Sequence, residues 1–294
     1  VVKDVIGREW QLGTVQVDYN QLINEANKQI QITIDLNSVD SWSKKLNRLI
    51  ENAKRELQLI NNKERNEIKS SKPAKEVFSR LSLLLDSNLS NKEAREAVEV
   101  LKTDTDKLID TTNEFIQMTL DVNSVATWKK KLNTLTKDAM KDLRWISRES
   151  IERIVSEKPS GSLLKRLKSY PPTTKTETAI SDLKIDIEKL VLNTNQRVLN
   201  AEKKQRKKFF DTIEKTPLTS EQAEAVISYD NRVQVIAAAG SGKTSVMVAR
   251  AAYAIDKGFA DPEKVLLLAF NKDAASELKE RIDERLTAAR IPSE

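Results

Sequence analysis

Hydrophobic residues in the first two thirds of the chain recur at the spacing of an α-helix. Trp42, Leu46, Leu49 and Ala53 are three or four residues apart, so they share one face of a helix. Residues 22–34 carry a similar stripe. The pattern predicts long amphipathic helices that bury one side against each other.

This pattern is duplicated. The segment Asp35–Leu49 recurs without a gap at Asp121–Leu135, 86 residues later, and the offset also holds upstream and downstream. A match of this length indicates duplication of one structural unit. A partial third copy begins near Glu188. The expected domains are a first copy at 21–106, a second at 107–187, and a partial third with a connecting helix at 188–215.

Polar and proline positions predict where these helices end. Asn37-Ser38 and the equivalent Asn123-Ser124 are expected to end one helix and cap the next. Pro73 and Pro159 predict a second break in each copy, followed by a shorter helix. The copies should therefore form an elongated, antiparallel array of helices.

A loop at 171–174 and a last long polar helix at about 177–215 complete the helical part. The basic run at 203–208 is expected to be a solvated helix face, with phosphate contact as the alternative. Trp42 and Trp128 hold equivalent places in the two copies. They are expected to anchor the two cores, with stacking on nucleic acid as the minor alternative.

The pattern changes near Val233. Residues 233–237 are an apolar run that predicts a strand, and an apolar-rich helix is expected from Ser245. The turn between them contains Gly240 and Gly242, which allow backbone conformations that a Cβ resists. A strand, a glycine-rich turn and a helix in this order are the setting of a phosphate-binding loop, because backbone amides and the helix N-terminus then face the anion.

A second apolar run at 265–270 predicts another buried strand, and a further helix opens near Asp273. Strand, helix and strand in this order predict a parallel βαβ unit with a right-handed crossover. The expected fold is therefore mostly α, with a helical repeat array followed by the start of an α/β RecA-like phosphate-loop domain at 216–294.

These motifs resemble the superfamily 1A, or UvrD/Rep-like, DNA helicases, closest to those of the DNA helicase IV type. The resemblance implies ATP and Mg²⁺ as cofactors, single-stranded or forked DNA as partner, and translocation from 3′ to 5′ on one strand. The pieces that carry it are residues 209–217, 218–222, 237–244 and 266–275.

The resemblance also implies roles for single residues. Lys243 would reach the β- and γ-phosphates, and Thr244 would give its hydroxyl to Mg²⁺. The implied ATP-binding set is Gln222, Ala237, Ala238, Ala239, Gly240, Ser241, Gly242, Lys243, Thr244 and Ser245. The chain departs from the generic loop pattern at Ala237, where that pattern has glycine, although the superfamily commonly starts with alanine.

Two of the implied roles have alternatives. Gln222 matches the glutamine that reads adenine, but it is also the N3 residue of a helix capping box that starts at Thr219. Phe270, with Asn271 and Lys272, lies where the family contacts single-stranded DNA. The alternative for Phe270 is that it ends a core strand. Ala269 stands where the family more often has threonine, which removes one possible hydroxyl contact.

The sequence contains no Walker B motif, no arginine-finger motif and no second RecA-like domain. The chain is therefore expected to be a fragment that binds ATP without unwinding DNA. An alternative function is an RNA polymerase-associated, helicase-like ATPase whose helical repeats are a protein-interaction arm. A helical binding module with an inert motor remnant is a third possibility.

Composition adds limits to these expectations. The net charge of +6 only weakly favours a nucleic-acid partner. The absence of cysteine and histidine excludes disulfides and thiolate or imidazole chemistry, and it fits a cytoplasmic protein. No apolar run is long enough for a membrane span. Residues 7–20 resemble a segment of the threonyl-tRNA synthetase core, and residues 1–20 are interpreted as a fused remnant.

Overall fold

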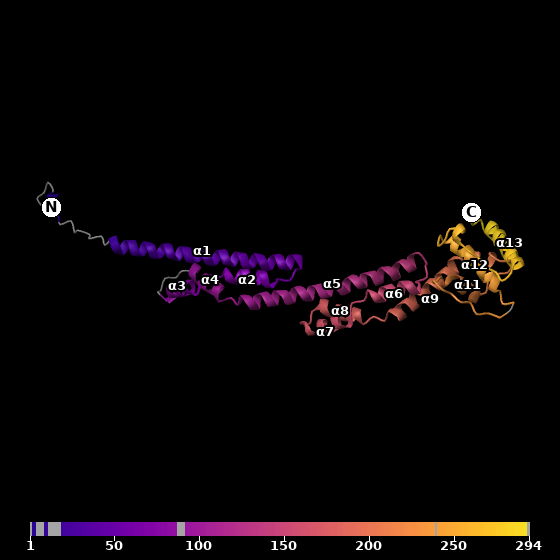
Figure 1. Cartoon of the computed structure of the whole chain (residues 1–294), viewed down its shortest axis with the longest axis horizontal. Helices are drawn as coiled ribbons and strands as arrows, with labels where there is room; N and C mark the ends of the chain where they lie inside the picture. The colour runs from indigo at the N-terminus through magenta and orange to yellow at the C-terminus, as the bar shows by residue number, and fades with distance from the viewer. Residues whose placement is uncertain (1, 4–8, 11–18, 87–91, 239, 293–294) are drawn as a thin grey trace. The chain divides into compact units, whose positions relative to one another are not determined.

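The described part of the chain is mostly α-helical (Figure 1). The chain divides into two compact units, residues 1–120 and 121–294. None of the helices in the described ranges combines the length and apolar character that a bilayer crossing demands. The computed structural model describes residues 2–3, 9–10, 19–86, 92–238 and 240–292.

The helices have the following bounds: α1 (Tyr19–Glu56), α2 (Asn62–Ser70), α3 (Lys75–Asp86), α4 (Lys92–Lys102), α5 (Thr105–Lys141), α6 (Arg148–Ser156), α7 (Gly161–Ser169), α8 (Thr174–Leu183), α9 (Ile187–Gln205), α10 (Lys207–Thr212), α11 (Ser220–Ile227), α12 (Lys243–Asp256), the 3₁₀ turn η1 (Pro262–Lys264) and α13 (Lys272–Ala289).

Two short strands precede these helices. β1 (Val2–Lys3) pairs antiparallel with β2 (Glu9–Trp10), with Val2 opposite Trp10 and Lys3 opposite Glu9. Most of the synthetase-like stretch at 7–20 lies outside the described residues. The interpretation of this stretch as a fused remnant therefore stays a prediction.

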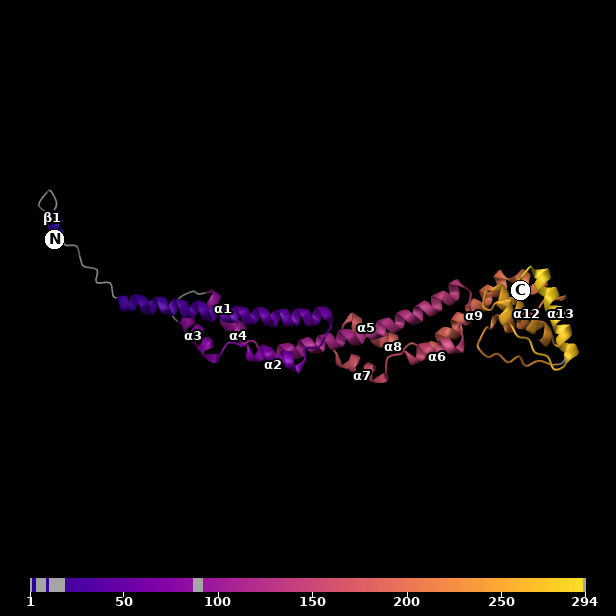
Figure 2. The same cartoon turned by 45° about the horizontal axis from the view of Figure 1, so that its top comes forward.

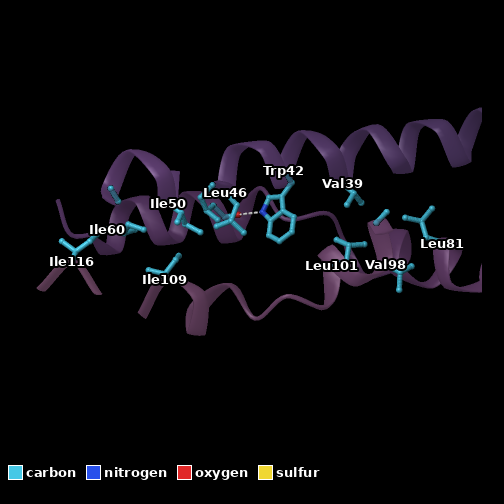
Figure 3. Packing of buried hydrophobic residues seen from close by; sticks show 13 residues of the cluster. Val39, Trp42, Leu46, Ile50, Ile60, Leu81, Val98, Leu101, Ile109 and Ile116 are labelled. Atoms are coloured by element: carbon cyan, nitrogen blue, oxygen red, sulfur yellow. Dashed lines mark hydrogen bonds between the residues drawn. The ribbon is translucent and has the colours of Figure 1, made fainter. Parts of the chain in front are cut away.

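The first compact unit is built on the apolar face of α1. Val39, Trp42, Leu46 and Ile50 recur at helical spacing and are buried in one cluster with residues of α2, α3, α4 and the start of α5. Figure 3 shows the Trp42 indole at the centre of this cluster, and its Nε1–H donates to the carbonyl of Ile68 at 3.1 Å. This bond fixes α2 against α1.

The second compact unit contains an equivalent core. Trp128 of α5 is buried with Leu132, and its Nε1–H donates to the carbonyl of Ile154 in α6 at 3.0 Å. A separate cluster joins Phe210 and Tyr253, and it brings α9 and α10 against α11, α12 and α13. Figure 2 shows α9, α12 and α13 of this group. The loop at the start of α12 is therefore attached to the helices that precede it in sequence.

Several contacts recur at the sequence offset of 86 residues. The guanidinium of Arg80 donates to both carboxylate oxygens of Asp35 at 2.6 and 2.7 Å, and Arg166 does the same to Asp121 at 2.9 Å. The two tryptophan bonds described above are equally spaced. Both indoles are buried, which removes them from stacking on nucleic acid in this conformation and supports their expected role as core anchors.

The predicted helix ends at Asn37-Ser38 and Asn123-Ser124 are wrong, because α1 and α5 run through both sites. The Ser38 hydroxyl donates to the Asp35 carbonyl, and the Ser124 hydroxyl donates to the Asp121 carbonyl, both at 2.8 Å. Each hydroxyl is thus satisfied inside the helix. Neither residue is glycine or proline, so their weak helix propensity is outweighed by packing of the neighbouring tryptophan.

The single helix predicted at 177–215 is also wrong. The structure has α8, α9 and α10 instead, with breaks at Leu183–Ile187 and at Arg206. Asp186 causes the first new start, since its carboxylate accepts from the backbone N–H of Lys189 as an N-cap. The breaks predicted at Pro73 and Pro159 are confirmed, and the loop predicted at 171–174 ends at Thr173, because α8 begins at Thr174.

Acid should weaken the first compact unit through Asp35. Its hydrogen bond with Arg80 holds the pKa of the Asp35 carboxyl below its ordinary value of 3.8. This stabilisation is fully present above the unfolded pKa and is lost as the pH falls through the lower folded pKa. In urea titrations at pH 6 and pH 3, Asp35→Asn should therefore show a smaller acid-induced loss of stability than the parent. Arg80 is half exposed, so the difference should be about 1 kcal/mol or less.

Candidate functional site

The glycine-rich loop ahead of α12 has the backbone that its sequence requires. Gly240 has φ of 78°, and Gly242 has φ of 88° in the left-handed region. Gly242 is the N-cap of α12, and no described side chain caps this helix. The amides of the first turn therefore keep the capacity to bind an anion, and the helix dipole favours negative charge there.

Lys243 folds back over this loop. Its Nζ donates to the carbonyls of Ala237 at 2.9 Å and Ala238 at 2.8 Å. The Ser241 hydroxyl also donates to the Ala238 carbonyl at 2.7 Å. The ammonium group is thus held at the loop by neutral acceptors that an anion can replace. Thr244 follows in the first turn of α12 with an exposed side chain, and Ala239 lies outside the described residues.

Gln222 joins α11 to the same loop. Its Oε1 accepts from the Thr219 amide at 2.9 Å, and the Thr219 hydroxyl accepts from the Gln222 amide at 3.2 Å, which completes the capping box. Its Nε2 donates to the Ser241 carbonyl at 3.0 Å. A Cβ at Gly242 would stand 2.5 Å from this Nε2, so the close approach of Gln222 also requires glycine there.

A cavity of about 530 Å³ opens beside these residues. Gln222, Ser241, Lys243 and the segment 233–237 contribute to its wall. Its size lies in the usual range of ligand pockets. A larger cavity of about 970 Å³, between α5, α6 and residues 229–231, contains neither the glycine loop nor the start of α12. The smaller cavity is therefore the one that suits a phosphate-bearing ligand.

The strands predicted at 233–237 and 265–270 are absent, because both segments lie outside any helix or ladder in the structure. Ile236, Leu266 and Leu268 are exposed. A parallel strand needs hydrogen-bonding neighbours and cover on both faces, and the described chain supplies neither to these segments. The apolar pattern alone does not make a sheet.

The residues with a predicted DNA role lie at the end of the second of these segments. The Phe270 side chain is fully exposed at 103%, so it is not part of the core. The Asn271 side chain accepts from the Ala274 amide at 2.8 Å and caps α13, and Lys272 is the first residue of that helix. An exposed ring beside a helix N-terminus and an ammonium group suits contact with a polyanion.

The sequence interpretation missed a bond that supports the first turn of α12. Arg281 of α13 donates to the Ser245 hydroxyl at 2.9 Å and to the buried Glu214 carboxylate at 3.0 Å. The Ser245 side chain is therefore engaged with α13. No sequence signal identifies Arg281, since it is one of several charged residues of an amphipathic helix.

The basic run at 203–208 is largely occupied by ion pairs. Lys203 lies 3.3 Å from Glu224, Lys207 lies 2.6 Å from Asp211, and Arg206 lies 3.0 Å from Glu202. Glu202 is itself buried, and the Tyr253 hydroxyl donates to it at 2.9 Å. Burial and this carboxylate raise the pKa of Tyr253. Lys203 therefore joins α9 to α11, and Arg206 also pairs with Asp256 of α12, whereas the pair of Lys207 lies within α10.

The C-terminal part of the chain is similar to known proteins. Residues 218–292 match the model of the UvrD/REP helicase N-terminal domain. DNA helicase IV of Escherichia coli is 48% identical over 101 residues, which are 34% of this chain and 15% of that protein. No solved structure matches the chain.

Two further relatives align with shorter stretches. The probable DNA helicase II homolog of Mycoplasma capricolum is 45% identical over 65 residues, which are 22% of this chain and 9% of that protein. The ATP-dependent DNA helicase PcrA of Staphylococcus aureus is 40% identical over 67 residues, which are 23% of this chain and 9% of that protein. The chain thus spans less than a sixth of the length of these relatives.

Proposed function

We propose that the chain supplies the ATP-binding part of an ATP-dependent DNA helicase, because residues 218–292 match the model of the UvrD/REP helicase N-terminal domain. The observation that carries this proposal is the position of Lys243, folded over the loop at the uncapped start of α12. Relatives named as DNA helicases support it, and one of them is named as ATP-dependent.

In this proposal the loop binds the phosphates of ATP. The amides from Gly240 to Thr244 donate to phosphate oxygens, and Lys243 exchanges its two carbonyl acceptors for the β- and γ-phosphates. Thr244 gives a hydroxyl oxygen to Mg²⁺. ATP, when bound, supplies the free energy that drives movement along DNA.

Gln222 has a double role in the proposal. Its amide now bonds Thr219 and Ser241, so it already connects the capping box to the loop. The adenine edge offers one donor and one acceptor, as this amide does, and would replace these partners. Adenine binding and loop conformation are then linked through one side chain.

The two apolar segments at 233–237 and 265–270 would complete the βαβ unit. We propose that they become neighbouring parallel strands when further strands flank them, because the matched relatives are much longer than this chain. The side chains now exposed would then be covered on both faces. The alternative function, in which the helical repeats are a protein-interaction arm of an RNA polymerase-associated ATPase, stays a prediction.

DNA would lie beside Phe270. Its exposed ring offers a stacking surface for an unpaired base, and the Asn271–Lys272 pair offers polar and charged contacts to the strand. The direction of translocation, 3′ to 5′, follows from the family resemblance alone. Unwinding would need a Walker B motif and a second RecA-like domain, which this chain's sequence does not contain.

Titration of the chain with a fluorescent ATP analogue tests the proposal. Lys243→Ala should weaken binding roughly tenfold or more, because a charge-assisted hydrogen bond contributes about 1.5–3 kcal/mol. The matched control is Lys264→Ala, which removes an exposed lysine paired with Asp261. That variant should bind like the parent.

Equal affinities of the parent, Lys243→Ala and Lys264→Ala would reject the proposed role of the loop. Circular dichroism of each variant separates a loss of binding from a loss of folding, since Lys243 is exposed and contributes no core contact. Binding of single-stranded DNA by Phe270→Ala, measured in parallel, addresses the nucleic-acid contact.

A further inference from the structure

The first half of α1 carries an apolar stripe that the described structure leaves open. Leu22 is 58% exposed, and Ile23 and Ile30 are each 57% exposed. The buried part of α1 begins only at Asp35 and Val39. A row of large aliphatic side chains along one helix face is normally covered.

The equivalent residues of the other two copies are buried. Ile109 and Ile116, which stand 86 residues after Ile23 and Ile30, are both 0% exposed. They belong to the same buried cluster as Ile60, which lies in the turn between α1 and α2 of the first copy (Figure 3). In the third copy, Val191 and Val198 hold the same positions and are also buried. Each of these helices therefore covers the turn that follows the long helix of the preceding copy.

An asparagine fixes this arrangement in both places. The Asn113 side chain accepts from the Ile60 amide at 2.8 Å and donates to the Ile60 carbonyl at 3.0 Å. Asn195 makes the same pair of bonds with Ile146, at 2.8 and 3.1 Å. Both backbone groups of one residue are thus satisfied by one amide side chain. The asparagine at the matching position of α1 is Asn27, which is exposed.

The turn that accepts the asparagine also has the same backbone conformation in both copies. The residues Leu57 and Leu143, again 86 apart, have positive φ angles of 51° and 45°. They turn the chain at the end of each long helix, so that Ile60 and Ile146 present their backbone to the asparagine. In the described chain, both of these turns are already covered by helices of the same chain. A second molecule of this chain would therefore have no uncovered turn with which to bind α1.

We propose that the face of α1 formed by Leu22, Ile23, Asn27 and Ile30 is a docking surface for the end of one more repeat copy. The occupant is the turn of a further copy of the same repeat, like the turns at Ile60 and Ile146 in the two observed cases. In both observed cases the covering helix follows in sequence the copy that it covers.

Charged residues on α5 and α1 indicate which side chains the docked copy needs. Asp106 and Asp110 of α5 pair with Arg65 of the first copy. The matching positions of α1 are Asn20 and Asn24, which are neutral. The docked copy therefore needs the free N–H and C=O of a residue like Ile60 and an apolar surface, and it needs no basic residue at the position of Arg65.

Thiol labelling of an extended chain tests the proposal. A second copy of residues 19–104 is inserted directly before Tyr19, so that Tyr19 follows Asp104 as Thr105 does. The chain has no cysteine, so Ile30→Cys gives one reporter thiol. Its alkylation should be roughly tenfold or more slower in the extended chain than in the parent, because only opening of the docked end exposes it.

Two controls bracket the measurement. Ile116→Cys should react slowly in both chains, and Leu83→Cys, at a position 67% exposed, should react quickly in both. Asn27→Ala should restore much of the reactivity at position 30 in the extended chain and change nothing in the parent. Retained protection in Asn27→Ala would overturn the role of the asparagine.

Equal alkylation at position 30 in parent and extended chains overturns the docking surface. A second extension guards against misfolding of the first. It inserts residues 105–186 before Tyr19, so that Tyr19 follows Asp186 as Ile187 does. If either extended chain gains the helical signal of the added copy while position 30 stays as reactive as in the parent, the proposal is wrong.

Discussion

Gly242→Ala should reduce ATP binding roughly five- to thirtyfold, because the loop can no longer keep its conformation without strain. The alanine would hold a left-handed backbone at φ of 88°, which costs about 1–2 kcal/mol for a residue with a Cβ. Its Cβ would also stand 2.5 Å from Gln222 Nε2. The loop should therefore relax to a conformation in which its amides no longer converge, and binding must reverse this change.

Gly258→Ala is the matched control for this experiment. Gly258 has a positive φ of 67°, but a Cβ there would meet no atom within 4 Å. The variant therefore introduces similar backbone strain away from the loop. Titration with a fluorescent ATP analogue should show parent-like affinity for Gly258→Ala. If Gly242→Ala also keeps the parent's affinity, the loop does not bind the phosphates.

Trp128→Ala should lower the free energy of unfolding of the second compact unit by about 3–5 kcal/mol. The indole is buried, its N–H satisfies the Ile154 carbonyl, and the Lys158 ammonium lies 5.4 Å from the ring centroid. Truncation leaves a cavity and an unpaired buried carbonyl. Urea titration followed by circular dichroism measures the loss.

Trp145→Ala is the internal comparison for the tryptophan experiment. Trp145 belongs to the same compact unit but is only partly buried, at the edge of the larger cavity. Its truncation should cost clearly less. Equal losses in the two variants would contradict the assignment of Trp128 as the centre of its core.

Local patterns predicted much of the helical part. The spacing of Trp42, Leu46 and Ala53 identified the buried face of α1, and Pro73 marked a true break. The sequence overstated the effect of Ser38, because a hydroxyl can bond within its own helix. It also missed Asp186 as a cap, since a lone acidic residue in a polar stretch resembles many others.

In the candidate site, too, the sequence predicts local features better than contacts between helices. Gly240, Gly242 and Lys243 are predictable because the requirements of the loop are local. The bond from Arg281 to Ser245 joins residues of two helices, and its formation depends on how those helices pack. The strands predicted at 233–237 and 265–270 are not formed in this structure, because an apolar pattern specifies a preference for burial while a ladder needs partners.

The uncovered side chains of Leu266, Leu268 and Phe270 have a practical consequence for work with this chain. Extended apolar backbone outside a ladder is a template for pairing with another molecule. The same residues that would pack around a neighbouring strand in a longer protein make the separate chain prone to aggregation. Low protein concentration and a solubilising fusion partner are therefore the natural conditions for handling it.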